Sequence, residues 1–255
     1  MSKASTGDSI IVLLGGGHVS GKKTTAITVK KELMSIMPKN SINVQIIDMN
    51  AYTDYSKSSV DSRKFLSIET SAITIRKEDK QYDILKPSRF DFKKLKQDVK
   101  LLSKRNEEEE EEPQRVLLVH GLYALYDKEL RDLAHIKVFI DGDPDTRLIR
   151  WIERDVLERK TDTLEGVINA YLFGARVEMN YYIFPTKEFA DVVMPRGAEP
   201  NAVRLVIDGV LLYLTGKNAH PERLNVSGYN LRPTEIGIFE RERFDVQKNK
   251  FYQLN

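Results

Sequence analysis

Short apolar runs alternate with longer mixed stretches along most of the chain. The runs are rich in Val, Ile and Leu, which is typical of strands that are buried on both faces of a sheet. The runs that predict strands are residues 10–14, 42–47, 116–119, 136–140 and 190–194. Strands that alternate with helices predict an α/β fold, in which a parallel sheet carries helices on both faces.

Two of the intervening stretches, residues 24–37 and 146–158, predict helices. In the first stretch, Ile27, Leu33 and Met34 can lie on one face of a helix. We therefore expect these three side chains to form the face that packs on the sheet.

Two segments interrupt the alternation. Residues 107–112 are six consecutive glutamates, and because like charges repel one another, we expect an exposed acidic loop over residues 103–114. From Asn218 onward the chain is polar and carries prolines, without evident chemistry. The predicted organisation is a single domain over residues 1–217, followed by a polar C-terminal extension over residues 218–255.

Composition narrows the class of protein. The net charge of +2 is too small to favour nucleic acid or an anionic membrane as a partner. The sequence has no cysteine, which excludes disulfides and thiolate metal sites. No apolar run approaches the roughly 20 residues of a membrane span, and the first residues lack the apolar core of a signal peptide. We expect a cytoplasmic protein, with the nucleus as the alternative.

The segment GGGHVSGKKTT, residues 15–25, follows the first apolar run and nearly matches the phosphate-binding pattern G-x-x-x-x-G-K-[ST]. Gly16, Gly17 and Gly21 would let backbone N–H groups approach an anion. Lys22 would reach the outer phosphates, and the following helix would direct its positive end to the same place. The segment therefore predicts binding of the phosphates of ATP, against the alternative of a plain glycine-rich turn.

Lys23 departs from this pattern, because it occupies the position at which a Ser or Thr hydroxyl holds Mg²⁺. An ammonium group cannot ligate a cation. Two explanations are open. The loop could bulge by one residue, so that Lys23 binds phosphate and Thr24 ligates the metal. Alternatively, Lys23 could replace the metal with its own charge.

Several segments resemble those of the uridine-cytidine kinase and phosphoribulokinase family. The loop GGHVSGKKTT is similar to the family's GGSASGKTT, and DGDPDTRL and PTKEFADVVMPRG are similar to two of its more specific segments. YDILKPSRFDF, residues 82–92, is a weaker match to NFDHPDAFD. The resemblance covers residues 9–214. It implies a five-stranded P-loop kinase core with a small lid and a nucleoside-binding hairpin region.

The same resemblance implies transfer of the γ-phosphoryl group of ATP to the 5′-hydroxyl of uridine or cytidine, a reaction of pyrimidine salvage. It also implies a homo-oligomer. Arg154 and Arg159 match the arginines of the family's lid that grip phosphate. The aspartate of HPDAFD aligns with Ser88, which leaves Asp83 nearby as the candidate substrate residue, together with Tyr52.

The family's metal shell is altered at three positions. Its hydroxyl becomes Lys23, the aspartate of QDSFY aligns with Met49, and the glutamate of FEG becomes His120. Asp48, one residue before Met49, is the remaining candidate for the catalytic carboxylate. Because Mg²⁺ prefers hard oxygen ligands, these changes make its binding doubtful. A structural role for His120 and a packing role for Met49 are the alternatives.

The nucleoside side departs furthest from the family. The segment YDFVTHSR, which contacts the base in the family, is replaced by SKRNEEEEEEPQ. Three functions are therefore open. The chain could be a uridine or cytidine kinase with weak or lost activity, a catalytically inactive nucleotide-binding module with a regulatory or interaction role, or a kinase for another small hydroxyl acceptor.

Overall fold

The structure is a computed structural model, and it describes residues 9–38, 41–53, 86–104 and 113–214. These residues all belong to the first of the two units into which the chain divides, residues 1–216. The glutamate run and the expected C-terminal extension lie outside the described residues. The division into a domain and an extension therefore stays a prediction.

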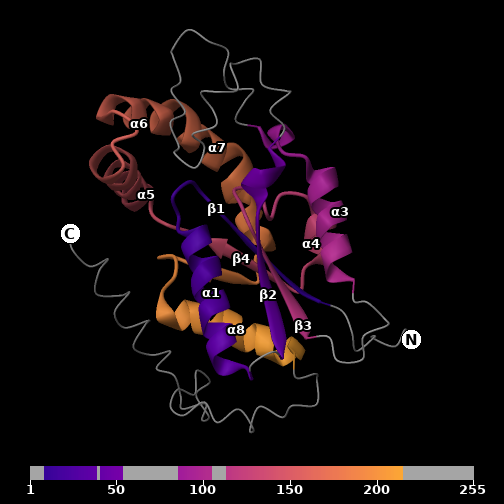
Figure 1. The fold of residues 1–255 in the computed structure, drawn as a ribbon. Coiled ribbons are helices and arrows are strands. Elements are labelled where there is room, and N and C mark those ends of the chain that lie inside the picture. Colours follow the sequence, from indigo (N-terminus) through magenta and orange to yellow (C-terminus); the bar gives the residue numbers. More distant parts are fainter. Residues whose placement is uncertain (1–8, 39–40, 54–85, 105–112, 215–255) are drawn as a thin grey trace, which may run out of the picture. The chain divides into compact units, whose positions relative to one another are not determined.

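Five parallel strands form one sheet in the order β2-β3-β1-β4-β5 (Figure 1). The strands are β1 (Ile10–Gly16), β2 (Ile42–Asp48), β3 (Gln114–His120), β4 (Ile136–Ile140) and β5 (Val192–Met194). Each strand lies on one of the apolar runs. Both the strands and the parallel α/β fold are therefore confirmed.

The helical elements are of three kinds. The α-helices are α1 (Lys22–Ile36), α3 (Phe92–Ser103), α4 (Lys128–Leu133), α5 (Pro144–Ile152), α6 (Leu164–Ala170), α7 (Arg176–Glu178) and α8 (Pro200–Leu214). The 3₁₀ turns are η1 (Met49–Tyr52), η5 (Pro87–Arg89) and η9 (Phe184–Phe189). Three π-helical segments complete the set, η6 (Glu153–Glu158), η7 (Tyr171–Ala175) and η8 (Met179–Ile183).

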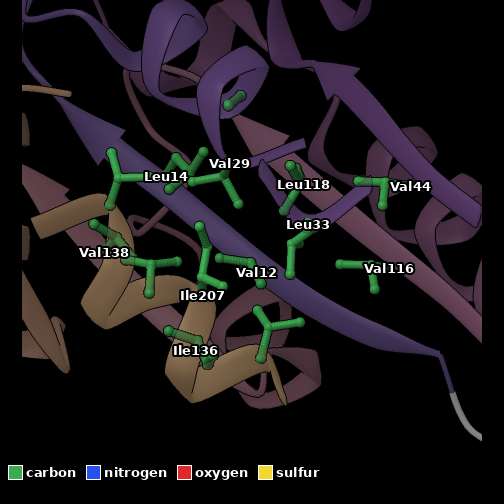
Figure 2. Close-up of a cluster of buried hydrophobic side chains, with 14 of the residues drawn as sticks. Val12, Leu14, Val29, Leu33, Val44, Val116, Leu118, Ile136, Val138 and Ile207 are labelled. Atoms are coloured by element: carbon green, nitrogen blue, oxygen red, sulfur yellow. The ribbon is translucent and has the colours of Figure 1, made fainter. Parts of the chain in front are cut away.

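Helices cover both faces of the sheet, because successive side chains of each strand point to opposite faces. On one face, Val12 and Leu14 of β1 pack with Leu33 of α1 and Ile207 of α8 (Figure 2). On the other face, Ile11 and Leu13 pack with apolar residues of α3, α4 and η8. Burying each of these side chains contributes about 1.5–3 kcal/mol.

The packing face of α1 differs from the expected one. Ile27 is 50% exposed and Met34 is 55% exposed, whereas Leu33 is buried as predicted. The buried side chains of α1 are Thr25, Ala26, Val29 and Leu33. The helix begins at Lys22, and the small side chains of its second turn let it lie close to the sheet. Side-chain size therefore misled the prediction of the face.

The second predicted helix, residues 146–158, contains a change of helix type. The α-helix ends at Ile152 and continues as the π-helical η6. Two more π segments, η7 and η8, flank the single turn α7. Segments of this type are rare and are often found near functional sites, because the extra residue in the turn redirects the side chains that follow.

The described residues show no hairpin. An isolated antiparallel bridge joins Thr53 to Phe90, on either side of residues 54–85. Those residues lie outside the described part of the chain and include the candidate Asp83, so the expected nucleoside-binding hairpin and the role of Asp83 stay predictions.

Candidate functional site

The carboxyl ends of β1, β2 and β3 meet at one edge of the sheet. Asp48 ends β2 and pairs in register with His120, which ends β3 and also pairs with Leu14 of β1. The loop between Gly16 and Lys22 starts from the same edge. Strand order reverses on the two sides of β1, and such a point in a parallel sheet is a common place for a ligand.

Each predicted loop glycine has a geometric reason. A Cβ on Gly16, whose φ is 141°, would lie 2.3 Å from the carbonyl oxygen of Ile140. A Cβ on Gly17 would lie 2.7 Å from a terminal nitrogen of Arg147. Gly21 has a φ of 99° and forms the N-cap of α1. The loop therefore has no room for side chains at the first two positions and turns left-handed at the third.

Lys22 is the first residue of α1, and its Nζ donates a hydrogen bond of 2.5 Å to the carbonyl oxygen of Gly17. Burial lowers the pKa of Lys22 to about 7, and Arg147 acts in the same direction, whereas Asp48 and Glu178 oppose the shift. A buried ammonium group beside another cation is stabilised by an anion. Lys22 therefore lies beside the loop with a charge that an anion would stabilise, and its role in binding phosphate stays a prediction.

Arg147 on α5 was not predicted as a site residue. It is buried, its Nε donates to the carbonyl oxygen of Gly142 at 3.0 Å, and burial lowers its pKa. Among the described residues, its Nη1 and the Oγ of Ser20 are buried polar atoms without a hydrogen-bond partner. Phosphate oxygens would fit both groups, so the residues of the loop suit a nucleotide. The signal lay in DGDPDTRL, from which no site residue was drawn.

Asp48 holds the candidate catalytic carboxylate. Its Oδ1 accepts the N–H of Asn50 at 2.9 Å, its Oδ2 lies 3.9 Å from Nε2 of His120, and its side chain is 34% exposed. Burial lowers the pKa of the His120 imidazole, Lys22 and Lys23 add to this effect, and Asp48 opposes it. Met49 is fully buried in the core and would touch any Cβ on Gly121. Asp48 is therefore the residue presented at the edge, and Met49 packs.

The proposed metal positions lie on the first turn of α1, where Lys23 and Thr24 are both exposed. Within the described residues there is no group of three or more His, Asp or Glu side chains that could hold a metal ion. Asp48 is a single carboxylate, and its neighbour His120 is a weak ligand for Mg²⁺. This donor set does not fit a metal held by protein side chains, and the expectation of doubtful Mg²⁺ binding stays a prediction.

The two candidate lid arginines differ in their surroundings. Arg154 lies on η6 and makes a bidentate pair with Asp155, with Nε–Oδ1 and Nη2–Oδ2 distances of 2.7 and 2.8 Å. It is near enough to Lys22 to lower that pKa further. Arg159 is exposed at the end of η6. The structure therefore brings Arg154 toward the loop, and the role of Arg159 stays a prediction.

Tyr52, the other substrate candidate, is half-buried in η1. Burial and a hydrogen bond to Asp98 of α3 raise the pKa of its hydroxyl to about 12. Its hydroxyl is therefore engaged with α3, and a contact with substrate stays a prediction.

A buried carboxylate that sequence reasoning missed lies beside the loop. Glu178 on α7 is 0% exposed. Its Oε2 lies 2.6 Å from Nε2 of His18, and its Oε1 lies 2.7 Å from Arg89 and accepts the hydroxyl of Tyr123. No spacing in the sequence indicated this cluster, because its members come from four separate segments.

The model of the Phosphoribulokinase / Uridine kinase family matches residues 11–202. The chain belongs to this family. That match covers the loop between Gly16 and Lys22 and, apart from Ile10, all five strands.

Two relatives of this family member match most of the chain. It is 27% identical over 253 residues, 96% of each chain, to the "Putative uridine kinase DAS2" of Saccharomyces cerevisiae. It is 32% identical to a uridine kinase of Clostridium tetani, with 82% of this chain and 97% of the relative covered. Among solved structures, the "putative fructose transport system kinase" of Silicibacter sp. TM1040 has a TM-score of 0.50 at 16% identity, covering 76% and 93% of the two chains. That likeness supports the fold.

The described part of this kinase-family chain contains no helix that is long and apolar enough to cross a membrane.

Proposed function

We propose that the protein binds the phosphates of ATP in the loop between Gly16 and Lys22 and transfers the γ-phosphoryl group slowly to the 5′-hydroxyl of a pyrimidine nucleoside. The observation that carries the proposal is the half-buried Lys22, whose ammonium donates a hydrogen bond to the carbonyl oxygen of Gly17 in the glycine loop and lies near the Asp48 carboxylate. The uridine kinases among its relatives support the choice of nucleoside.

The chain's own residues supply binding, charge and a base. Lys22 and the amino end of α1 hold the outer phosphates of ATP. The acceptor oxygen forms a bond to the γ-phosphorus as the bond to the β–γ bridging oxygen breaks, so that ADP leaves. Asp48 accepts the proton of the acceptor hydroxyl. Arg154 is near enough to Lys22 to stabilise charge that spreads over the transferred group.

The slow rate follows from the groups around Asp48. Lys23 and His120 bring an ammonium and an imidazole to positions where hard oxygen ligands would hold Mg²⁺. These side chains can neutralise phosphate charge, but they do not supply the Lewis-acid stabilisation that a bound Mg²⁺ would supply. We therefore expect turnover below the roughly 1–100 per second that is typical of kinases.

A second function, a nucleotide-binding module without catalysis, is favoured by one observation. The ion pair between the half-buried Arg89 and the buried Glu178 lies near the loop, and Glu178 is close enough to Lys22 to act on its pKa. If that pair excludes the nucleoside, ATP binds and no transfer occurs.

The deciding experiment incubates purified protein with ATP, Mg²⁺ and uridine or cytidine, and detects the 5′-monophosphate by mass. Asp48→Asn and Lys22→Ala are run beside the wild type, so that a contaminating kinase is recognised. Product that both variants lose supports slow transfer. ATP binding without product, in the presence or absence of EDTA, supports the non-catalytic module and refutes the kinase.

A further inference from the structure

The carboxylate of Glu178 connects segments that are far apart in the sequence. It accepts hydrogen bonds from His18 in the loop after β1 and from Tyr123 after β3, and it forms an ion pair with Arg89 on η5. Glu178 itself lies on α7, between the π-helical segments η7 and η8. His18 is held from a second side by Trp151 of α5, with the rings stacked 5.6 Å apart. The side chain of Glu178 thus links the loop after β1 to α7, to η5 and to the segment after β3.

The residue after His18 explains why the loop needs such fastening. Val19 has a φ of 53°, a left-handed conformation that is unfavourable for a β-branched residue. A conformation of this kind persists only where the surrounding structure imposes it. Val19 packs against the cluster around Trp151, and the bonds of His18 hold the position immediately before it.

We propose that Glu178 is a positioning residue for nucleotide binding, which acts through His18 to hold the loop in the conformation that receives the phosphates. This inference rests on the proposed binding of ATP in that loop. Glu178 touches neither phosphate nor acceptor in this account. Its effect is on the shape of the loop, and therefore on the affinity for ATP.

A purely structural ion pair would predict different behaviour. A buried pair replaced by apolar side chains of similar volume often leaves a protein equally stable, because the desolvation of two charges is avoided. If Glu178 and Arg89 only fill the interior, the double variant Arg89→Met with Glu178→Met folds and binds ATP normally. If Glu178 positions His18, the same variant folds but binds ATP weakly.

The experiment measures ATP affinity by titration calorimetry and stability by thermal unfolding on the same samples. We expect Glu178→Gln and the double Met variant to lose about tenfold in affinity, the value of one hydrogen bond to a charged group. In turnover assays the KM for ATP rises by the same factor, and the KM for the nucleoside stays unchanged. Tyr123→Phe is the matched control, because it removes a donor from the same carboxylate and leaves His18 bound. Its ATP affinity should stay within about twofold.

A double-mutant cycle tests the route through His18. His18→Ala should weaken ATP binding about tenfold in the wild type and leave it unchanged in the double Met variant. Two results would overturn this inference alone. In the first, the losses of ATP affinity caused by His18→Ala and by the double Met variant multiply when the changes are combined. In the second, the double Met variant binds ATP as the wild type does. A wild type that binds no ATP would overturn the proposed function as well.

Discussion

The loop after β1 and the ends of β2 and β3 bring different kinds of groups to the same edge of the sheet. The loop offers glycines, backbone groups and Lys22, whose ammonium donates to the carbonyl oxygen of Gly17. The neighbouring strand ends offer a single carboxylate, Asp48, beside the imidazole of His120. Phosphate recognition by backbone depends on conformation, whereas a metal shell depends on the identity of each side chain.

This difference explains how one half of a site can change while the other remains. A different side chain at position 120 keeps the strand pairing, because His120 pairs with its neighbours through backbone groups, as any strand residue does. Substituting Gly16 would force a clash with the backbone of Ile140, and substituting Gly17 would displace the end of the Arg147 side chain. The loop after β1 and the ends of β2 and β3 can therefore be tested by separate substitutions.

The largest effect should come from Lys22→Ala. Removing the ammonium deletes a buried, charge-assisted contact with phosphate, and we expect ATP affinity to fall about a hundredfold. Thermal stability should not fall, because the pKa of Lys22 is depressed and its charge is therefore costly to bury. Lys31→Ala, an exposed position on the same helix, is the control. Calorimetry that finds equal affinity in Lys22→Ala would contradict the assignment of the loop.

Oxygen ligands placed at positions 23 and 120 should change the chemistry near Asp48, at the ends of β2 and β3. We expect Lys23→Thr combined with His120→Glu to raise the Mg²⁺-dependent rate of nucleoside phosphorylation more than tenfold, because a bound metal would stabilise charge in the transition state. The readout is the initial rate with Mg²⁺ and with EDTA. Each single variant serves as its control. A double variant with no gain in rate would place the defect on the nucleoside side instead.

The pH dependence of binding isolates the charge of Lys22. Its pKa of about 7 reflects burial, Arg147 and Arg154, opposed by Asp48 and Glu178. Phosphate binds the charged ammonium, so above pH 7 binding requires the uptake of a proton. We expect ATP affinity to fall about tenfold per pH unit above 7 and to level off below it.

Lys22→Arg provides the comparison for that titration, because a guanidinium stays charged throughout and ATP titrates identically in both proteins. The difference between the two pH profiles reports Lys22 alone. Superimposable profiles would show that Lys22 does not titrate in this range.

The smallest effect should follow Arg147→Met. We expect about a fivefold loss of ATP affinity, since one cation is removed from beside the loop. The free energy of unfolding should be unchanged or higher, because Arg147 is buried with a terminal nitrogen that has no partner in the described chain. Arg204→Met on the exposed side of α8 controls for loss of charge. A large drop in melting temperature without loss of affinity would make Arg147 structural.

The sheet could be predicted from sequence because its strands are buried on both faces and read as continuous Val- and Ile-rich runs. The loop could be predicted because it is local, with all its residues between Gly16 and Lys22. The prediction of the packing face of α1 was wrong, because Ile27 and Met34 are large side chains but lie exposed.

The cluster around Glu178 could not be predicted in the same way. In the sequence, His18 lies 160 positions from Glu178, and Tyr123 lies 55 positions from it. Neither charge nor periodicity links single residues over such separations. The π-helical turns η7 and η8 on either side of α7 also shift the helical phase, so a pattern of 3.6 residues per turn assigns the wrong inward face.

The bridge between Thr53 and Phe90 has a consequence for how this chain can vary. The bridge holds the residue after η1 next to the residue after η5, so the two ends of the intervening segment lie together. The entropic cost of closing such a segment rises only slowly, by about 0.6 kcal/mol for each doubling of its length. Insertions and deletions between these anchors are therefore cheap. The chain can therefore become longer or shorter between Thr53 and Phe90 at little cost to the sheet.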